Sequence, residues 1–248
     1  MSEEALQPRF PSTLAPPAYY DGLVDRLTDA LLPVLAPYFS TAAPAKPKHL
    51  LELASGNGTH SALFARTWPG LVVRPTECDD FGCSAVDQTS EKEGVSLLAG
   101  EKAGGVKKAV KLDVLDGEDW RGLEGLTAGE QKPYDFVFGS NFLHMVPFPE
   151  APKAIFRHLT AITSARARFL IYGPFKEDAG FFSQADEEFD YTIRARPNGS
   201  YLGLRSIDAF SRLADKEGWR LEEKKGMPKG NWVLVFARRG QDASGREL

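Results

Sequence analysis

Short apolar segments with the pattern of β-strands alternate along most of this chain with segments whose apolar residues recur at helical spacing. The clearest strand candidates are His49–Ala54, Leu71–Thr76, Asp135–Gly139 and Arg168–Tyr172. A continuous apolar run is expected where helices cover both faces of a strand. The alternation therefore predicts an α/β fold, with a Rossmann-like, mostly parallel sheet and helices on both of its faces.

The remaining predicted elements are shorter or less regular. They are helices over 18–38, 61–68, 150–162, 181–196 and 206–217 and within 79–93, and strands over 109–114, 220–225 and 232–237. The length of 248 residues suits one sheet domain with additions. We predict an N-terminal arm and cap helix over 1–48, the sheet domain over 49–238 and a disordered tail over 239–248.

Composition excludes several classes of protein. The 30 basic and 34 acidic side chains give a net charge of −4, which argues against a general nucleic-acid binder. No apolar run approaches the roughly 20 residues that a membrane-spanning helix needs, and acidic residues near the start argue against a secretory signal. Cys78 and Cys83 are too few for a disulfide framework. We expect a cytoplasmic protein, monomeric or homodimeric, with neither a nucleic-acid nor a membrane partner.

A glycine-containing turn follows the first predicted strand of the sheet. Its residues run Glu52-Leu53-Ala54-Ser55-Gly56-Asn57-Gly58-Thr59-His60. Gly56 and Gly58 let the backbone turn sharply and approach a ligand closely, and the N–H groups of the next helix then point toward the turn. Such a turn is also common as a plain strand-to-helix connection, so alone it is a weak signal.

Acidic residues at the ends of the next two strands strengthen this signal. Glu77 ends the second strand, where the carboxylate of a nucleotide-binding fold accepts from ribose hydroxyls. Asp113 ends the third strand and could accept from an adenine amine. Their alternative roles are a solvated strand end for Glu77 and a helix cap for Asp113.

The same turn discriminates between nucleoside cofactors. A dinucleotide site prefers a third glycine where this chain has Ser61, and the carboxylate of Glu52 would repel a pyrophosphate. A carboxylate instead suits a ligand that carries an ammonium or sulfonium group. The residues therefore favour S-adenosylmethionine over a nicotinamide cofactor.

With these motifs the chain resembles the class I S-adenosylmethionine-dependent methyltransferases and, more narrowly, the methyltransferase-like 26 family. The motifs run in family order from about residue 50 to residue 237: Leu51–His60, Leu112–Val114, Ser140–His144, Tyr172–Phe175, Phe189–Asp190 with Arg194 and Arg196, Gly203–Arg205, and Met227–Pro228 with Asn231. The N-terminal part departs from the family, since Tyr19-Tyr20-Asp21 stands where an Arg-Asn pair is usual.

The resemblance implies a seven-stranded sheet with an antiparallel last strand. It also implies a cofactor site formed by Glu52, Ala54, Ser55, Gly56, Gly58, His60, Glu77, Asp113, Val114, Ser140, Asn141 and Phe142. From its place at the start of a helix, His60 is expected to line either the methionine part of the cofactor or the substrate pocket. Four scattered histidines without a His-x-x-x-His pair predict no metal site.

The candidate catalytic residues follow the fourth and fifth strands. His144 could take a proton from an acceptor hydroxyl or amine, and Tyr172 could orient that acceptor by a hydrogen bond. A loop histidine with a purely structural role and a half-buried core tyrosine are the alternatives. Candidate substrate contacts are Tyr20, Phe175, Asp190, Arg194 and Asn231, although Tyr20 also suits the core and Asp190 with Arg194 also suits a surface ion pair.

These inferences predict methyl transfer from S-adenosylmethionine to an oxygen or nitrogen of a small molecule such as a specialised metabolite. One alternative is a protein that binds the cofactor without methyltransferase activity. A nicotinamide-dependent oxidoreductase is a second alternative, which Ser61 and Glu52 disfavour.

Overall fold

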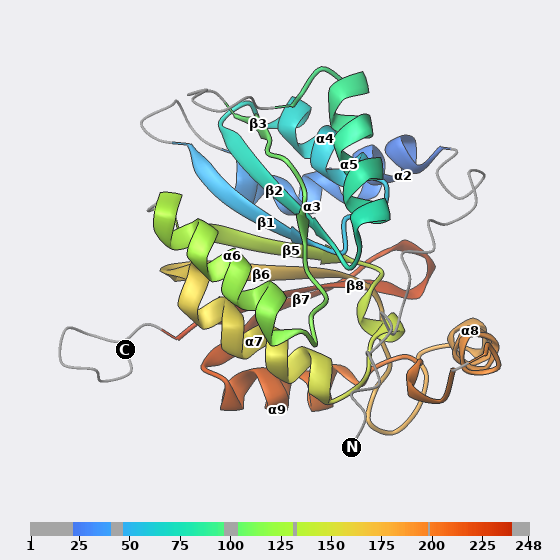
Figure 1. The fold of residues 1–248 in the computed structure, drawn as a ribbon. Helices are drawn as coiled ribbons and strands as arrows, with labels where there is room; N and C mark the ends of the chain where they lie inside the picture. Colours follow the sequence, from blue (N-terminus) through green and yellow to red (C-terminus); the bar gives the residue numbers. More distant parts are fainter. Residues whose placement is uncertain (1–21, 41–46, 97–103, 131–132, 198, 240–248) are drawn as a thin grey trace. The chain divides into compact units, whose positions relative to one another are not determined.

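The structure is a computed structural model that describes residues 22–40, 47–96, 104–130, 133–197 and 199–239. The chain divides into two compact units, Met1–Leu123 and Glu124–Leu248. Figure 1 shows the elements of both. Residues 1–21 of the predicted N-terminal arm and cap helix, among them the predicted substrate residue Tyr20, and nearly all of the predicted tail lie outside the described residues.

The first unit is built on parallel strands. Its elements are α2 (Leu23–Ala30), α3 (Leu32–Phe39), β1 (Lys48–Leu53), α4 (Thr59–Thr67), β2 (Leu71–Glu77), α5 (Asp80–Lys92), β3 (Gly105–Val106), β4 (Val110–Lys111) and the start of α6 (Gly117–Glu130). β2 lies between β1 and β3, pairs in parallel with both, and also pairs with β4. Of the predicted third strand over 109–114, only Val110–Lys111 is a strand, and β3 precedes the predicted range.

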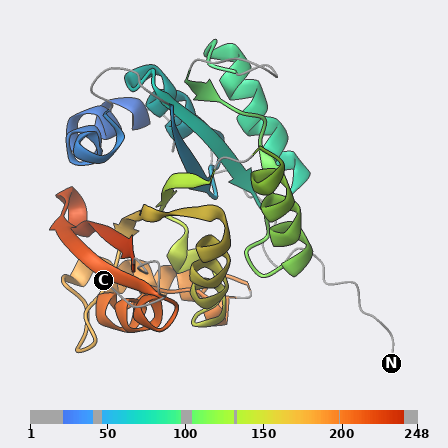
Figure 2. The same cartoon turned by 90° about the vertical axis from the view of Figure 1, so that its left-hand side faces the viewer.

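The second unit combines parallel and antiparallel pairing. Its elements are β5 (Tyr134–Ser140), η1 (Leu143–Met145), α7 (Glu150–Ile162), β6 (Thr163–Pro174), α8 (Gln184–Arg194), η2 (Gly199–Tyr201), α9 (Ile207–Lys216), β7 (Trp219–Gly226), η3 (Pro228–Gly230) and β8 (Asn231–Arg238). β5 pairs with β6 in parallel, and β8 lies antiparallel between β6 and β7. The hairpin of β7 and β8 is red in Figure 2. The predicted α/β fold, with mostly parallel strands and an antiparallel last strand, is confirmed.

Two helices differ from the sequence prediction. The predicted helix over 18–38 is divided at Leu31 into α2 and α3, and Pro33 stands in the first turn of α3. Proline has no N–H to donate to the preceding turn, so one continuous helix would lose a hydrogen bond there. The helix α6 was not predicted, because four glycines within its span lower its helix propensity.

Aromatic side chains fill the core of the second unit. Phe156 on α7 lies 5.6 Å from Phe169, 5.2 Å from Phe210 and 5.4 Å from Phe236, measured between ring centroids. Trp219 donates from its indole N–H to the carbonyl oxygen of Phe156 at 3.2 Å. α7 and α9 lie side by side on the strands, whereas α8 stands apart from both (Figure 1). This packing holds β5 and β6 in place, and the segments that follow these strands carry the predicted catalytic residues.

The longest described helix, α6, has 14 residues, and no described helix is both long and apolar enough to cross a bilayer.

Phe156→Ala should lower the free energy of unfolding by about 3–5 kcal/mol, because the ring is fully buried and its removal leaves a cavity among aromatic neighbours. Urea denaturation followed by circular dichroism measures this. The matched control is Phe81→Ala, since the Phe81 side chain is 65% exposed and should change stability little. Equal losses in the two variants would contradict the core assignment.

Candidate functional site

The turn between β1 and α4 has an unusual backbone in the first unit. Ala54, Gly56 and Gly58 have φ angles of 53°, 62° and 83°. Gly58 is the residue before α4, and a Cβ atom there would lie 3.1 Å from Val86 on α5. The two glycines thus serve the sharp turn that the sequence predicts, and Gly58 also allows α5 to approach closely.

The carboxylate of Glu77 holds this turn against the end of β2. Its Oε1 accepts from the backbone N–H of Gly56 at 2.6 Å, and its Oε2 accepts from the N–H of Cys78 at 3.2 Å. The side chain is buried, and burial raises its pKa. A carboxylate has about four acceptor positions, so two remain for the hydroxyls of a ligand.

Asp113 and Glu77 lie around the side chain of Cys78. The thiol of Cys78 lies among the carboxylates of Glu77, Asp79 and Asp113; burial first, and then these charges, raise its pKa to about 12. Asp113 Oδ1 accepts from the N–H of Leu115 at 2.9 Å, a bond within the turn before α6 and not the helix cap weighed as its alternative role. Oδ2 accepts no hydrogen bond from the described residues, so it can still accept from a ligand amine. The same turn is closed by Trp120, whose indole N–H donates to the carbonyl of Val114 at 3.0 Å.

Glu52, at the end of β1, is almost completely buried. The Ser61 hydroxyl donates to its Oε2, and Nδ1 of His60 lies 3.7 Å from its Oε1. Burial raises the pKa of Glu52 to about 8 and lowers the pKa of His60 to about 4. At neutral pH both groups are therefore mainly uncharged, and a cationic ligand would favour the ionised form of Glu52.

Buried hydroxyl groups join the end of β1 to the end of β2. The hydroxyl of Ser55 accepts from the N–H of Thr76 at 3.2 Å, and the Thr76 hydroxyl donates to the carbonyl of Glu52 at 2.9 Å. The backbone N–H of Ser55 donates to the carbonyl of Thr76 at 2.9 Å. Five first-unit residues of the predicted set thus lie on one connected network: Glu52, Ser55, Gly56, His60 and Glu77.

The other predicted cofactor residues lie in the second unit, where β5 ends. Asn141 has a φ of 54°, and its N–H donates to the carbonyl of Tyr172 at 2.8 Å. Its amide nitrogen lies 3.3 Å from the hydroxyl of Ser140. The ring of Phe142 is buried on Gly139, where a Cβ atom would come within 2.3 Å of the ring. Gly139 is therefore needed for this packing.

His144 lies in η1 and is buried. Its ring centroid lies 5.3 Å from that of Phe189 on α8, at an interplanar angle of 75°. Burial first, and then the positive charges of Arg205 and Arg196, lower its pKa to about 4. The imidazole is therefore neutral at pH 7, the form that can accept a proton, although a low pKa makes it a weak base.

Arg205 is a buried residue that sequence reasoning did not place in the site. It is 8% exposed and donates to the carbonyls of Leu143 at 3.3 Å and of Val146 and Tyr201 at 2.6 Å each. It thus fixes the turn that carries His144. It occurs in the Gly203–Arg205 motif, but a lone arginine in a sequence does not reveal which backbone carbonyls it will bind.

Asp190 and Arg194 form the predicted ion pair on α8. Asp190 Oδ2 accepts from Nε of Arg194 at 2.6 Å, and Oδ1 accepts from the N–H of Leu204 at 2.6 Å. Asp190 is buried, so this pair anchors a loop as well as joining two helix positions.

Two predicted substrate residues make structural contacts. Phe175 is 1% exposed and packs on Phe210 with ring centroids 6.2 Å apart, which places it in the core. Asn231, at the start of β8, donates from its side chain to the carbonyl of Pro228 at 3.3 Å.

Tyr172, a predicted catalytic residue, lies on β6 and is half-buried. The hydrogen bond expected from its hydroxyl to the methyl acceptor stays a prediction.

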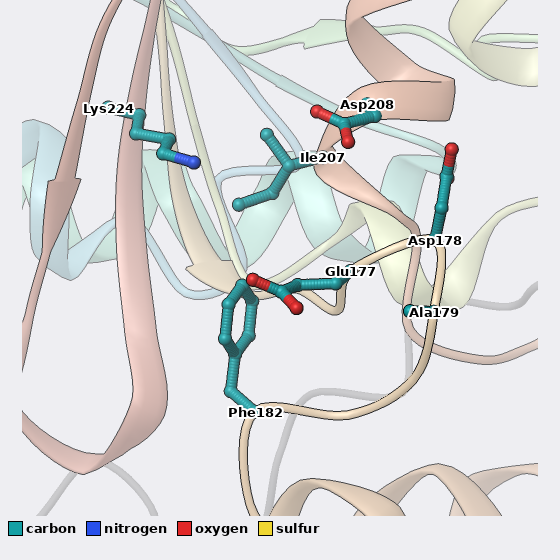
Figure 3. Close-up of a pocket in the computed structure, with 7 residues that line it drawn as sticks. All are labelled: Glu177, Asp178, Ala179, Phe182, Ile207, Asp208 and Lys224. Atoms are coloured by element: carbon teal, nitrogen blue, oxygen red, sulfur yellow. The ribbon is translucent and has the colours of Figure 1, made fainter.

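A cavity of about 270 Å³ in the second unit holds none of the predicted residues. Its lining residues are Glu177, Asp178, Ala179, Phe182, Ile207, Asp208 and Lys224 (Figure 3). Asp178 already accepts from Arg212 at 2.9 Å and from the Ser206 hydroxyl.

Across the described residues, no group of three or more His, Cys, Asp or Glu side chains could hold a metal ion.

Arg196→Met should raise the pKa of His144 above about 4, because a nearby cation disfavours the charged imidazolium. Arg205→Met should raise it further, since Arg205 has the larger effect. A proton NMR titration of the His144 ring measures both. Arg212→Met is the control, because Arg212 pairs with Asp178. An unchanged His144 pKa in the two test variants would contradict the assigned cause.

Solved structures with the same fold include several methyltransferases. An O-methyltransferase family protein from Burkholderia thailandensis is 16% identical, with a TM-score of 0.65, and the match covers 90% of this chain and 59% of that one. The S-adenosylmethionine-dependent methyltransferase SibL is 15% identical, with a TM-score of 0.61 and coverages of 89% and 57%. A LepI variant in complex with SAH and a substrate analogue is 16% identical, with a TM-score of 0.59 and coverages of 86% and 48%.

The chain thus spans about half to three fifths of the length of these structures. At this level of identity the likeness establishes a shared fold. A family model matches residues 20–238, and by this match the chain belongs to the family described as "Protein of unknown function (DUF938)".

Proposed function

We propose that the protein is an S-adenosylmethionine-dependent methyltransferase that acts on an oxygen or nitrogen of a small molecule. The observation that carries this proposal is the acidic set at the ends of the first unit's parallel strands, Glu52, Glu77 and Asp113, next to a glycine turn. Ligands of open α/β sheets bind at these strand ends. The motifs that resemble those of the methyltransferase-like 26 family support the same proposal.

The residues fit the chemistry of this cofactor. Glu52 is a buried acid whose ionised form a ligand cation would favour, which suits the ammonium group of a methionine moiety. Glu77 keeps acceptor positions for two ribose hydroxyls, and Asp113 Oδ2 can accept from an adenine amine. The roles of Ala54, Val114 and Ser140–Phe142 in holding the cofactor stay predictions.

Bound S-adenosylmethionine would supply a methyl group on a positively charged sulfur. The protein then has to hold the acceptor in line and keep it deprotonated. His144 is the candidate base, since its imidazole is neutral at pH 7 and held by a fixed turn. A weak base of this kind suits an acceptor group that loses its proton readily.

Two other functions remain as alternatives. A protein that binds the cofactor without methyltransferase activity would keep the acidic set and lack turnover. A nicotinamide-dependent oxidoreductase is disfavoured by Ser61, whose hydroxyl donates to Glu52 at the position of the third glycine. Calorimetry with S-adenosylmethionine, S-adenosylhomocysteine and NAD separates these classes, and preferential binding of NAD would overturn the proposal.

The affinity for S-adenosylhomocysteine should rise with pH between pH 6 and 7, by up to about tenfold. Glu52, with a pKa of about 8, is mainly protonated in this range and must ionise to pair with the ligand's ammonium group. Calorimetry at the two pH values measures the slope, and Glu52→Gln should abolish it. A slope that persists in Glu52→Gln would assign the titration to another group.

Asp113→Ala should weaken the binding of S-adenosylhomocysteine about tenfold or more, because a hydrogen bond to a charged group contributes about 1.5–3 kcal/mol. The control is Asp116→Ala: Asp116 Oδ1 accepts from the N–H of Glu118 at 2.7 Å, the same turn geometry three residues away. Equal affinities of the two variants would remove Asp113 from the binding site.

A further inference from the structure

Arginine side chains gather around the turn that carries His144. Arg205 and Arg196 both lower the pKa of His144, so their charges act at this ring. Neither forms an ion pair with any described residue, whereas Arg194 is paired with Asp190. The charges that act on the His144 ring are thus both positive, while the carboxylates of Asp190 and Glu150 act on Arg205 in the opposite direction.

Arg194 is held in one orientation near the turn that carries His144. Its Nε donates to Asp190 at 2.6 Å, and Asp190 is fixed in turn by the N–H of Leu204. Its guanidinium lies against the backbone of Gly203, where a Cβ atom would come within 2.1 Å of Nη2. Gly203 has a φ of 137°, and its N–H donates to the carbonyl of His144 at 3.0 Å.

Both terminal amino groups of Arg194 are available for a ligand. The side chain is 41% exposed, and these two groups make no hydrogen bond with the described residues. A planar guanidinium that is already oriented loses less conformational entropy when it binds a carboxylate than a free one does. Arg205 adds positive charge nearby, since Arg194 lowers the pKa of Arg205.

A partly exposed aromatic ring lies against His144. Phe189, 37% exposed, packs edge-on against His144 at 5.3 Å, and it stands five residues before Arg194 on α8. An aromatic ring on a ligand could pack on Phe189 while its acid group reaches Arg194.

We propose that the exposed side chains of Phe189 and Arg194, in front of the buried side chains of His144 and Arg205, bind the methyl acceptor and that the acceptor is an aromatic carboxylate. The inference rests on the proposed methyltransferase function and specifies its substrate class. Arg194 binds the carboxylate, Arg205 adds positive charge, and Phe189 packs on the ring. His144 lies next to the bound acceptor.

The test compares 4-hydroxybenzoate with its neutral isostere 4-hydroxybenzamide, each titrated into the full-length protein in the presence of S-adenosylhomocysteine. The acid should bind about tenfold or more tightly than the amide, because charged hydrogen bonds distinguish them. Arg194→Met should remove this preference, and Arg212→Met, whose arginine pairs with Asp178 on the same unit, should keep it.

Arg194→Met leaves the buried carboxylate of Asp190 without its cation, and this unpaired charge could destabilise the fold. A second variant separates that effect from the loss of the ligand contact. The double variant Asp190→Asn/Arg194→Met leaves no unpaired charge and should show the same loss of preference. The proposal is overturned if 4-hydroxybenzoate does not bind, or if 4-hydroxybenzamide binds equally well. It is also overturned if both variants keep the preference for the acid over the amide.

The two proposals fail in different ways. If the protein does not bind S-adenosylhomocysteine, the methyltransferase proposal fails, and the comparison of acid with amide is then repeated without it. If it binds the cofactor product but shows no preference for the acid, the substrate proposal alone fails.

Discussion

The hydrogen bond from the N–H of Gly56 to the carboxylate of Glu77 is the contact on which the candidate cofactor site depends. It joins the turn after β1 to the end of β2 at 2.6 Å, across 21 residues of sequence. Without an acceptor at this place, a partly buried N–H group would lack a partner and the turn would be free to open. The same carboxylate therefore shapes the turn and retains capacity for a ligand.

The alternation of strands and helices was predictable because strands covered on both faces are apolar throughout, a signal that does not depend on distant residues. The division at Leu31 and the helix α6 were harder to predict, for opposite reasons. Pro33 interrupts a pattern that otherwise has the periodicity of one helix. In α6, Trp120 and Leu123 are buried at helical spacing, and this burial outweighs the low propensity of the glycines.

The candidate site was predictable to the extent that its residues stand at strand ends. Glu52, Glu77 and Asp113 each stand at or just after the end of a strand, so parallel pairing was enough to infer their place. Arg205 follows no strand, and its role depends on carbonyls 59 and 62 residues away in the chain. The core position of Phe175 was equally hidden, because a residue just after a strand can face either the core or a ligand.

Net charge conceals how ionisable groups are arranged in this protein. Burial keeps Glu52 mainly protonated and His60 and His144 neutral at pH 7, so these groups contribute little charge in the absence of a ligand. The first unit thus presents acids that a cation can ionise, whereas the second unit presents the oriented guanidinium of Arg194 on α8, a helix that also carries several acidic residues. Acidic and basic sites of this kind select ligands of opposite charge, a cationic cofactor and an anionic acceptor, although their charges nearly cancel in the sum.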